Sequence, residues 1–232
     1  NSQKKIIENL SEYLSDDDFS RIFVLNGFAG TGKTTLIAAL VAALKELRIK
    51  PVLLAPTGRA AKVLARYCGE QALTIHKRIY RQRTNADYES KFSLDFNREQ
   101  GAVFIVDEAS MLSDSTGDGA LFGSGSLLED LVSYVRSGRG CRLILVGDSA
   151  QLPPVGCDFS PALDPATVSR YGEVVYGLMD EVVRQQMQSG ILFNATLVRC
   201  MLENRIYEIP KFEMDYPDFE SVEGGDFMEK LQ

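Results

Sequence analysis

Gly27-Phe28-Ala29-Gly30-Thr31-Gly32-Lys33-Thr34 is the stretch that decides the fold of this 232-residue chain. It fits the pattern G-x-x-x-x-G-K-[ST], and it stands between a short apolar run typical of a strand and a run with helical periodicity. Its glycines let backbone N–H groups curve around phosphate oxygens without a Cβ in the way, and the following helix adds partial positive charge. The stretch therefore predicts a loop that cradles the phosphates of a nucleotide.

Individual residues of this loop have predicted roles in holding ATP and Mg²⁺. Lys33 is expected to reach the β- and γ-phosphates, and the Thr34 hydroxyl is expected to ligate Mg²⁺. The alternative, a glycine-rich structural turn, is disfavoured because a strand and a helix flank the loop. The predicted nucleotide-binding residues here are Gly27, Ala29, Gly30, Thr31, Gly32, Lys33, Thr34 and Thr35.

On both sides of the loop, short apolar runs alternate with helical patterns. The predicted strands are Ile22–Leu25, Val52–Ala55, Val103–Val106 and Leu143–Val146, and the predicted helices are Lys33–Leu47, Arg59–Tyr67 and Leu127–Arg136. Continuous apolar runs indicate strands that are buried on both faces, as in a parallel sheet between two helical layers. The fold class is therefore predicted as α/β, a three-layer P-loop NTPase domain with a central, mainly parallel sheet.

Three stretches depart from this alternation. Gln82–Gly101 is polar with three aromatic residues, and it is either a small inserted hairpin or a loop. Gly117–Ser126 is rich in glycine and serine and is expected to be a mobile loop. From Asn204 onward the chain is acidic and contains proline. We therefore expect one domain over residues 1–203 and an acidic linker over residues 204–232.

Two further strand ends carry residues suited to hydrolysis of ATP. Val103–Val106 is followed by Asp107, predicted to hold Mg²⁺, and by Glu108, predicted to accept a proton from the attacking water. Shortly after the run Cys141–Gly147 comes Gln151, whose amide can hydrogen-bond a γ-phosphate or the attacking water. The alternative for the two carboxylates is an ordinary acidic turn, which the phosphate loop makes less favoured. The alternative for Gln151 is an ordinary loop amide.

Charge is distributed unevenly in a chain whose composition is otherwise that of a globular protein. The net charge is −7, yet Lys45–Arg83 holds ten Lys/Arg against two Asp/Glu. Such a basic band indicates either an anion-binding face or a solvated helix face. The four cysteines have no zinc-site spacing, and the longest apolar run, Leu36–Leu44, is too short to span a bilayer. We expect a cytoplasmic protein without membrane contact.

Six strings of residues together resemble a superfamily 1 helicase of the RecD-like branch, which includes the phage helicase Dda. Each later string is weak alone, and their order and spacing carry the resemblance. The strings are GFAGTGKTT at 27–35, APTGRAAKVL at 55–64, TIHK at 74–77, VDEASML at 106–112, GDSAQLPPVG at 147–156 and VVRQ at 182–185. The resemblance implies a RecA-like motor domain that uses ATP and Mg²⁺.

The resemblance also assigns residues that the patterns alone do not. Arg184 resembles the arginine that reaches the γ-phosphate, with a surface ion pair as the alternative. Gln3 resembles the upstream glutamine that reads adenine. His76 is either a contact to single-stranded DNA or a structural histidine. Together with His76, the residues that the resemblance and the basic band assign to DNA are Pro56, Thr57, Arg59, Lys62, Thr74 and Lys77.

One departure from the family concerns its second RecA-like domain, which carries a further DNA grip and a second arginine. No matching sequence follows Gln185, so we expect that domain to be missing here. The expected function is the ATP-hydrolysing motor domain of a helicase that moves along single-stranded DNA, 5′ to 3′, in repair or recombination. The alternative is an ATP-dependent DNA-binding or regulatory module without motor activity. A GTPase is disfavoured, because no guanine-reading Asn-Lys-x-Asp string occurs.

Overall fold

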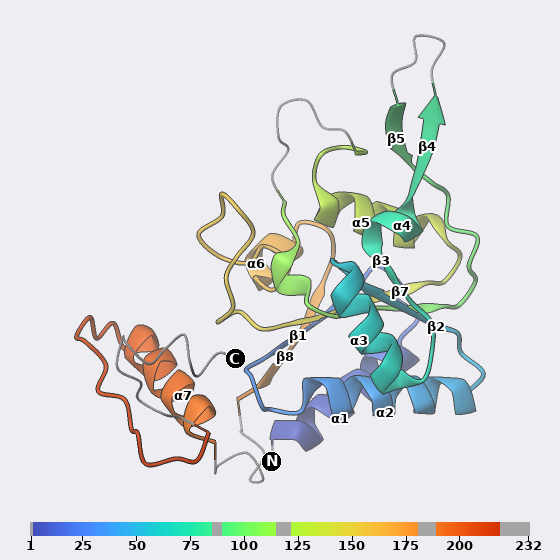
Figure 1. Cartoon of the computed structure of the whole chain (residues 1–232). Coiled ribbons are helices and arrows are strands. Elements are labelled where there is room, and N and C mark those ends of the chain that lie inside the picture. Colours follow the sequence, from blue (N-terminus) through green and yellow to red (C-terminus); the bar gives the residue numbers. More distant parts are fainter. Residues whose placement is uncertain (1, 85–89, 115–121, 181–188, 219–232) are drawn as a thin grey trace. The chain divides into compact units, whose positions relative to one another are not determined.

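The computed structural model describes residues 2–84, 90–114, 122–180 and 189–218 (Figure 1). The chain divides into two compact units. The large unit comprises residues 1–28 and 32–180, and the small unit comprises residues 29–31 and 181–232. No helix within the described residues is both long enough and apolar enough to cross a membrane.

A six-stranded sheet forms the centre of the large unit, and every pairing in it is parallel. Because all strands point the same way, their carboxyl ends meet at one edge, which we call the carboxyl edge. The four predicted strands are confirmed, whereas the two outermost strands were not predicted. The spatial order is β3 (Ala72–Thr74), β2 (Pro51–Ala55), β6 (Val103–Val106), β7 (Arg142–Gly147), β1 (Ile22–Gly27) and β8 (Val174–Met179).

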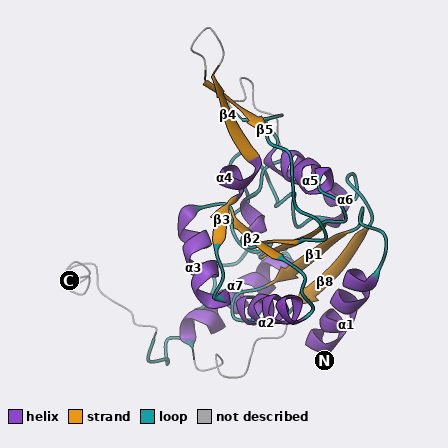
Figure 2. Ribbon diagram, turned by 90° about the vertical axis from the view of Figure 1, so that its right-hand side faces the viewer, coloured by secondary structure: helices purple, strands orange, loops and turns teal. Residues whose placement is uncertain are grey.

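Helices cover both faces of this sheet, as the views of Figures 1 and 2 show. Their apolar residues fall into two core clusters, one on each face. The predicted helices are confirmed to within one residue at each end, and so is the three-layer α/β class. On one face lie α1 (Ser2–Ser15), α2 (Lys33–Glu46) and α3 (Gly58–Cys68), and on the other α4 (Ile75–Ile79), α5 (Leu127–Ser137) and α6 (Pro165–Val168).

Strand β1 illustrates why the predicted strands are apolar throughout. Phe23 and Leu25 pack among the α1 and α2 residues, while Ile22 and Val24 pack in the cluster on the opposite face. All four side chains are at most 2% exposed. Full burial of such a side chain stabilises the fold by roughly 1.5–3 kcal/mol. The strand that leads into the phosphate loop is therefore held firmly from both sides.

A hairpin of β4 (Tyr80–Thr84) and β5 (Ser90–Leu94) stands beside the sheet as a separate antiparallel pair. The Tyr80 hydroxyl donates to Asp130 of α5 at 2.6 Å, and Phe92 stacks on Phe122 with ring centroids 4.5 Å apart. Of the two alternatives for Gln82–Gly101, a hairpin or a loop, the structure shows a hairpin, with different bounds. It begins two residues earlier than expected, and residues 95–99 form no strand.

The predicted mobile loop Gly117–Ser126 lies in part outside the described residues. In its described part, Ser126 is the N-cap of α5 and accepts a hydrogen bond from the Glu129 backbone N–H at 3.2 Å. Asp130 in the same helix accepts from the Ser124 N–H at 3.0 Å. This end of the predicted loop is therefore built into the start of α5.

The small unit contains α7 (Gly190–Glu203) and a segment that returns along it. The buried side chain of Asn194 donates to the Glu213 carbonyl and accepts from the Glu213 N–H, both at 2.8 Å. Asp218 accepts from the Ser189 hydroxyl and from the Gly190 N–H at 2.5 and 2.7 Å. Residues 204–218, predicted as a linker, thus return to the helix. The domain boundary after residue 203 stays a prediction.

Candidate nucleotide site

The phosphate loop connects β1 to α2, as the sequence predicts. Gly30 and Gly32 have φ angles of 77° and 92°, a region in which a Cβ causes strain. A Cβ built on Gly27 would lie 2.9 Å from the Lys33 Cγ and 3.0 Å from the Met179 Cβ, so this position has no room for one. Gly32 is also the N-cap of α2. Because glycine has no capping side chain, the first N–H groups of α2 are left for an anion.

Lys33 folds back over the loop that precedes it. Its Nζ donates to the carbonyls of Gly27 and Phe28 at 2.5 and 3.0 Å. The same Nζ lies 3.7 Å from the Asp148 carboxylate, which is buried just beyond β7. The ammonium group therefore bridges the carboxyl ends of β1 and β7. It lies next to the phosphate loop, where it is predicted to bind the phosphates of a nucleotide.

Asp107 and Glu108 follow β6 at the same carboxyl edge. Asp107 accepts a hydrogen bond from the Glu108 N–H at 3.0 Å. Burial raises the pKa of Asp107, and the Glu108 charge adds to this, whereas that hydrogen bond and Lys33 act against it. Glu108 has a φ of 55°, a left-handed conformation that is uncommon for a residue with a side chain. Such outliers cluster at functional sites, and here the turn leads directly into the short helix η1 (Ala109–Met111).

A cavity of about 340 Å³ lies beside these carboxylates. On one side it is lined by the residues predicted to act in ATP hydrolysis, and on the other by α3, the helix that carries several predicted DNA contacts. Its lining residues are Thr57, Arg59, Ala60, Val63, Asp107, Glu108, Met111 and Gln151. The structure thus gathers the ends of β2, β6 and β7 around one opening.

The donor set at this edge fits Mg²⁺ bound together with a nucleotide. Within the described residues, no three His, Cys, Asp or Glu side chains come together to hold a metal ion by themselves. Mg²⁺ is usually held by one or two carboxylates together with substrate phosphates and waters. Thr34 in the first turn of α2 and Asp107 after β6 are the protein groups that would hold it.

Asn26 is a residue of this edge that the sequence reasoning missed. Its amide nitrogen donates to the Ser149 hydroxyl at 2.8 Å and to the Tyr176 hydroxyl at 3.1 Å. Its carbonyl oxygen accepts from the Ser149 N–H at 3.0 Å. Asn26 thereby ties the segment after β7 and the middle of β8 to β1. The one available signal was a polar residue inside an apolar strand, which alone does not indicate its partners.

Two of the predicted DNA-contact residues have local structural roles. Thr57 accepts a hydrogen bond from the Ala60 N–H and caps α3, and Thr74 accepts from the Lys77 N–H and caps α4, both at 3.2 Å. Pro56 lies between the end of β2 and this cap. Pro56, Thr57 and Thr74 all lie at the carboxyl edge. Their contact with DNA stays a prediction.

The basic band does not form a single face, which corrects the view from the sequence. Lys50 immediately precedes β2 and Arg59 follows it, so the two lie at opposite edges of the sheet. Lys50 and Arg78 both bind Glu99, at 2.8 and 2.6 Å. Counting charge along the chain missed this, because Glu99 lies outside the counted segment. At the carboxyl edge, Arg59, Lys62 and Lys77 make no ion pair with any residue that the structure describes.

His76 packs against aromatic rings. Its ring meets Phe122 edge-on with centroids 5.0 Å apart, and it lies 5.6 Å from the Tyr80 ring. Burial lowers the pKa of His76, which keeps the ring neutral near pH 7. This environment gives His76 a structural role at the base of the hairpin, and its contact with DNA stays a prediction.

Of the two residues assigned only by resemblance, Arg184 lies outside the described residues. Gln3 is exposed in the first turn of α1. One turn later, Ile6 lies near β8, since a Cβ built on Gly177 would be 3.5 Å from the Ile6 Cγ1. Helix α1 runs from the carboxyl edge toward the start of β1. Gln3, in its first turn, therefore lies at the carboxyl edge, as the phosphate loop does.

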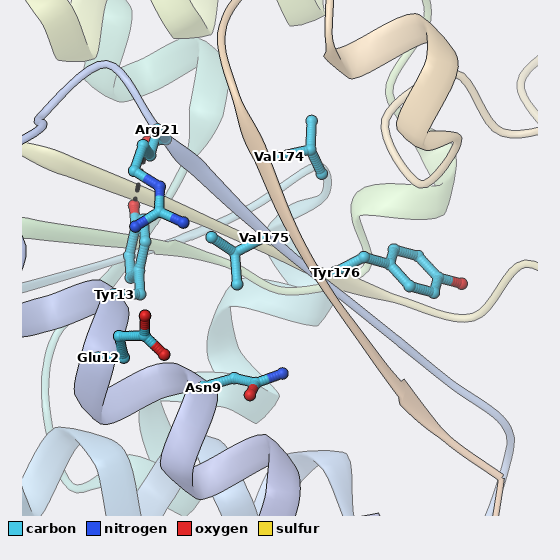
Figure 3. Close-up of a pocket in the computed structure, with 7 residues that line it drawn as sticks. All are labelled: Asn9, Glu12, Tyr13, Arg21, Val174, Val175 and Tyr176. Atoms are coloured by element: carbon cyan, nitrogen blue, oxygen red, sulfur yellow. Dashed lines mark hydrogen bonds between the residues drawn. The ribbon is translucent and has the colours of Figure 1, made fainter.

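A second cavity, of about 270 Å³, opens between α1 and β8 (Figure 3). It is polar, and Asn9, Glu12 and Arg21 surround it together with residues of β8. Arg21 is neutralised by Asp16 and by Glu173, the latter at 2.8 Å. Since Arg21 precedes β1, this cavity lies toward the opposite edge from the phosphate loop and is separate from the nucleotide site.

Asp107→Asn is expected to stabilise the free protein and to reduce the stabilisation that Mg²⁺ and ATP produce. A carboxyl whose pKa is raised by folding costs stability where it is ionised, and that cost disappears as the pH falls through the raised pKa. Asparagine removes the charge, so we expect a higher unfolding temperature at pH 7 in the absence of ligand. Thermal unfolding with and without Mg²⁺ and ATP measures both effects.

The matched control is Asp158→Asn, since Asp158 is exposed in the loop after β7. It should leave both the unfolding temperature and the shift produced by the nucleotide unchanged. If Asp107→Asn keeps the full shift of the wild type, Asp107 does not hold the metal.

Comparison with known proteins places this geometry in a family. A family model described as an AAA domain matches residues 2–191. The ATP-dependent RecD2 DNA helicase of Deinococcus radiodurans is 30% identical over 154 residues, which are 66% of this chain and 19% of that protein. The RecBCD enzyme subunit RecD of Mycobacterium tuberculosis is 33% identical over 201 residues, covering 70% of this chain and 32% of that one. The ATP-dependent DNA helicase dda of phage T4 is 34% identical over 136 residues, covering 56% and 28%.

The solved structures agree on the fold. The Pif1 helicase from Candida albicans matches with a TM-score of 0.53 and 20% identity, over 91% of this chain and 45% of that chain. The chain thus spans less than half the length of each of these relatives. The family match covers most of the chain, and the five motif strings that lie within the described residues stand at the carboxyl edge of a RecA-like sheet. The chain therefore belongs to the AAA domain family of P-loop proteins, within its RecD-like and Dda-like helicase group.

Proposed function

We propose that this chain binds ATP with Mg²⁺ and hydrolyses it as the first motor domain of a helicase that moves along single-stranded DNA. The observation that carries the proposal is the meeting of Lys33, Asp107, Glu108 and Gln151 at one edge of a parallel sheet. The relatives named RecD2 and dda are ATP-dependent DNA helicases, which supports the same activity here.

In this proposal, the chain's own groups bind and orient the reactants. Lys33 exchanges the carbonyls of Gly27 and Phe28 for phosphate oxygens, and the N–H groups of α2 bind the same anion. Glu108 takes a proton from the water that attacks the γ-phosphorus, while the bond to the β–γ bridging oxygen breaks and ADP leaves. Mg²⁺, when bound beside Thr34 and Asp107, neutralises charge on the phosphates. Arg184 contacts the γ-phosphate.

The finer parts of the proposal follow from the family. Movement is 5′ to 3′, the pathway is DNA repair or recombination, and the location is cytoplasmic. Gln3 reads adenine. A second RecA-like domain completes the cleft, as the resemblance implies. The relatives are three or more times longer than the part that matches this chain, which leaves room for such a domain. By itself the chain is expected to bind ATP and to hydrolyse it slowly.

The test of the proposed function is ATP hydrolysis by the protein as it occurs in the cell, with and without single-stranded DNA. A helicase motor should hydrolyse ATP faster when DNA is present, and it should separate a duplex that carries a single-stranded tail. An ATPase that does not respond to DNA would contradict the proposal. DNA binding without ATP-driven strand separation would favour a regulatory module.

We expect this chain to bind single-stranded DNA weakly through Arg59, Lys62 and Lys77. Binding is weak because the net charge of −7 repels a polyanion. A plot of log affinity against log salt concentration has a slope of about −0.7 for each phosphate of the single strand that the protein contacts. Two to four such contacts give a slope of about −1.5 to −3. Lys62→Glu with Lys77→Glu should weaken binding for any sequence and flatten the slope. Fluorescence anisotropy across a salt series measures both.

Arg98→Glu with Arg139→Glu is the control, because it changes the net charge equally at two exposed positions that precede β6 and β7, at the opposite edge of the sheet. This control should keep the wild-type slope. Equal binding by the Lys62/Lys77 variant and the control would show that the carboxyl edge is not the DNA channel.

A further inference from the structure

A buried serine connects the two loops that carry the predicted hydrolytic residues. Ser110 lies in η1, two residues after Glu108, and it is 0% exposed. Its Oγ lies 3.3 Å from the Oε1 of Gln151, which follows β7. This hydrogen bond joins the segment after β6 to the segment after β7.

The backbone fixes the place of Ser110 without help from its side chain. The left-handed turn at Glu108 directs Ala109 and Ser110 inward, where both are 0% exposed. A Cβ built on Gly147 would lie 2.9 Å from the Ser110 backbone nitrogen, so η1 rests directly on the end of β7. The Ser110 hydroxyl is therefore held at a defined point between the two strand ends.

The backbone of Gln151 is also fixed, although this residue is exposed. Its N–H donates to the Asp148 carbonyl at 3.1 Å, and the Ala150 N–H donates to the Asp148 carboxylate at 2.9 Å. These bonds close a turn from which the Gln151 side chain lines the cavity together with Asp107 and Glu108. The remaining freedom lies in the amide group, whose terminal torsion is broad and roughly two-fold.

We propose that Ser110 is a positioning residue that sets the orientation of the Gln151 amide. The Ser110 hydroxyl donates to Oε1, and this directs the Gln151 NH₂ group toward the cavity as a hydrogen-bond donor. A donor is what a γ-phosphate oxygen or the oxygen of the attacking water requires. The proposal rests on the proposed function, since it assigns Gln151 to the reacting phosphate.

The first test compares Ser110→Ala, Gln151→Ala and the double variant. Loss of one hydrogen bond corresponds to about a 3- to 10-fold effect. We expect Ser110→Ala to lower the rate of ATP hydrolysis, and the affinity for ADP with aluminium fluoride, by that factor. The affinity for ADP alone should stay unchanged, because only the γ-phosphate position is affected. In the Gln151→Ala background, Ser110→Ala should have no further effect, since the two residues act as one unit.

The second test addresses the polarity of the amide. Gln151→Glu keeps an acceptor for Ser110 but has no donor to offer, so it should lose as much activity as Gln151→Ala. Ser169→Ala is the matched control, because its exposed hydroxyl lies at the end of α6. Thermal unfolding of each variant separates a change in orientation from a loss of fold.

A third readout does not depend on ATP. The side-chain NH₂ resonances of Gln151 in a ¹⁵N correlation spectrum should shift or broaden in Ser110→Ala and not in Ser169→Ala. Unchanged resonances, or effects of the two alanine variants that add in the double variant, would overturn the proposal. If the wild type does not bind ADP with aluminium fluoride, the proposed function fails, while the resonances still decide whether Ser110 orients Gln151.

Discussion

Glu108→Gln is expected to lower the rate of ATP hydrolysis by about 10²- to 10⁴-fold, the usual contribution of a general base. Glutamine nearly preserves the shape of glutamate, and it can adopt the same left-handed backbone at φ 55°. The phosphate loop is unchanged, so the affinity for ATP should stay near that of the wild type. Phosphate release and isothermal calorimetry measure the two quantities separately.

The neighbouring Asp107 is the rival for the role of base, since it lines the same cavity and its pKa is raised by burial. Loss of each carboxylate is expected to have a different effect on the binding of ATP with Mg²⁺. Asp107→Asn should weaken binding of ATP with Mg²⁺, while Glu108→Gln should leave it intact. Glu129→Gln, exposed at the start of α5, is the control for the loss of one negative charge. Unchanged turnover in Glu108→Gln would mean that Glu108 is not the base.

Lys33→Ala is expected to weaken binding of ATP with Mg²⁺ by roughly 10- to 100-fold. A hydrogen bond to a charged group contributes about 1.5–3 kcal/mol, and each 1.4 kcal/mol is a factor of ten in affinity. Calorimetry on the wild type and the variant measures the loss. Equal affinity of the wild type and the variant for ATP would show that the phosphate loop is not the nucleotide site.

A second effect of Lys33→Ala has to be separated from the first. Asp148 is buried with Lys33 as its cationic neighbour at 3.7 Å, so the variant leaves a buried carboxylate without that partner and should lower the stability. The double variant Lys33→Ala with Asp148→Asn removes this charge as well. We expect the double variant to recover unfolding temperature and to recover no affinity for ATP. A recovery of affinity would show that the single variant lost it through misfolding.

The sequence by itself determined the features that depend on residues adjacent in the chain. The phosphate loop between β1 and α2 is a local pattern, because its glycines, its lysine and its flanking strand and helix are adjacent in the chain. The position of Asp107 and Glu108 could be predicted for the same reason, since a strand that is apolar on both faces must be buried and its carboxyl end must emerge at the ligand edge. The three-layer α/β fold followed from the same runs.

Elements with weak local patterns were missed. Strand β3 has three half-buried residues, and β8 lies at the edge of the sheet with Tyr176 and Leu178 38% exposed. Neither presents a continuous buried run, which is the signal that indicated the other four strands. The hairpin was placed two residues late, because the hydrogen-bond partner of Tyr80 at its start is Asp130, 50 residues away in the sequence.

Only the tertiary structure decided which polar groups meet. Asn26 binds Ser149, 123 residues along the chain, because β1 and β7 are neighbours in the strand order and no local pattern encodes that order. The pairing of Lys33 with Asp148 and of Ser110 with Gln151 has the same origin. The basic band illustrates the reverse. Lys50 and Arg59 are close in sequence, yet they lie at opposite ends of β2 and therefore at opposite edges of the sheet. Only the tertiary structure shows which charges of the basic band share the carboxyl edge.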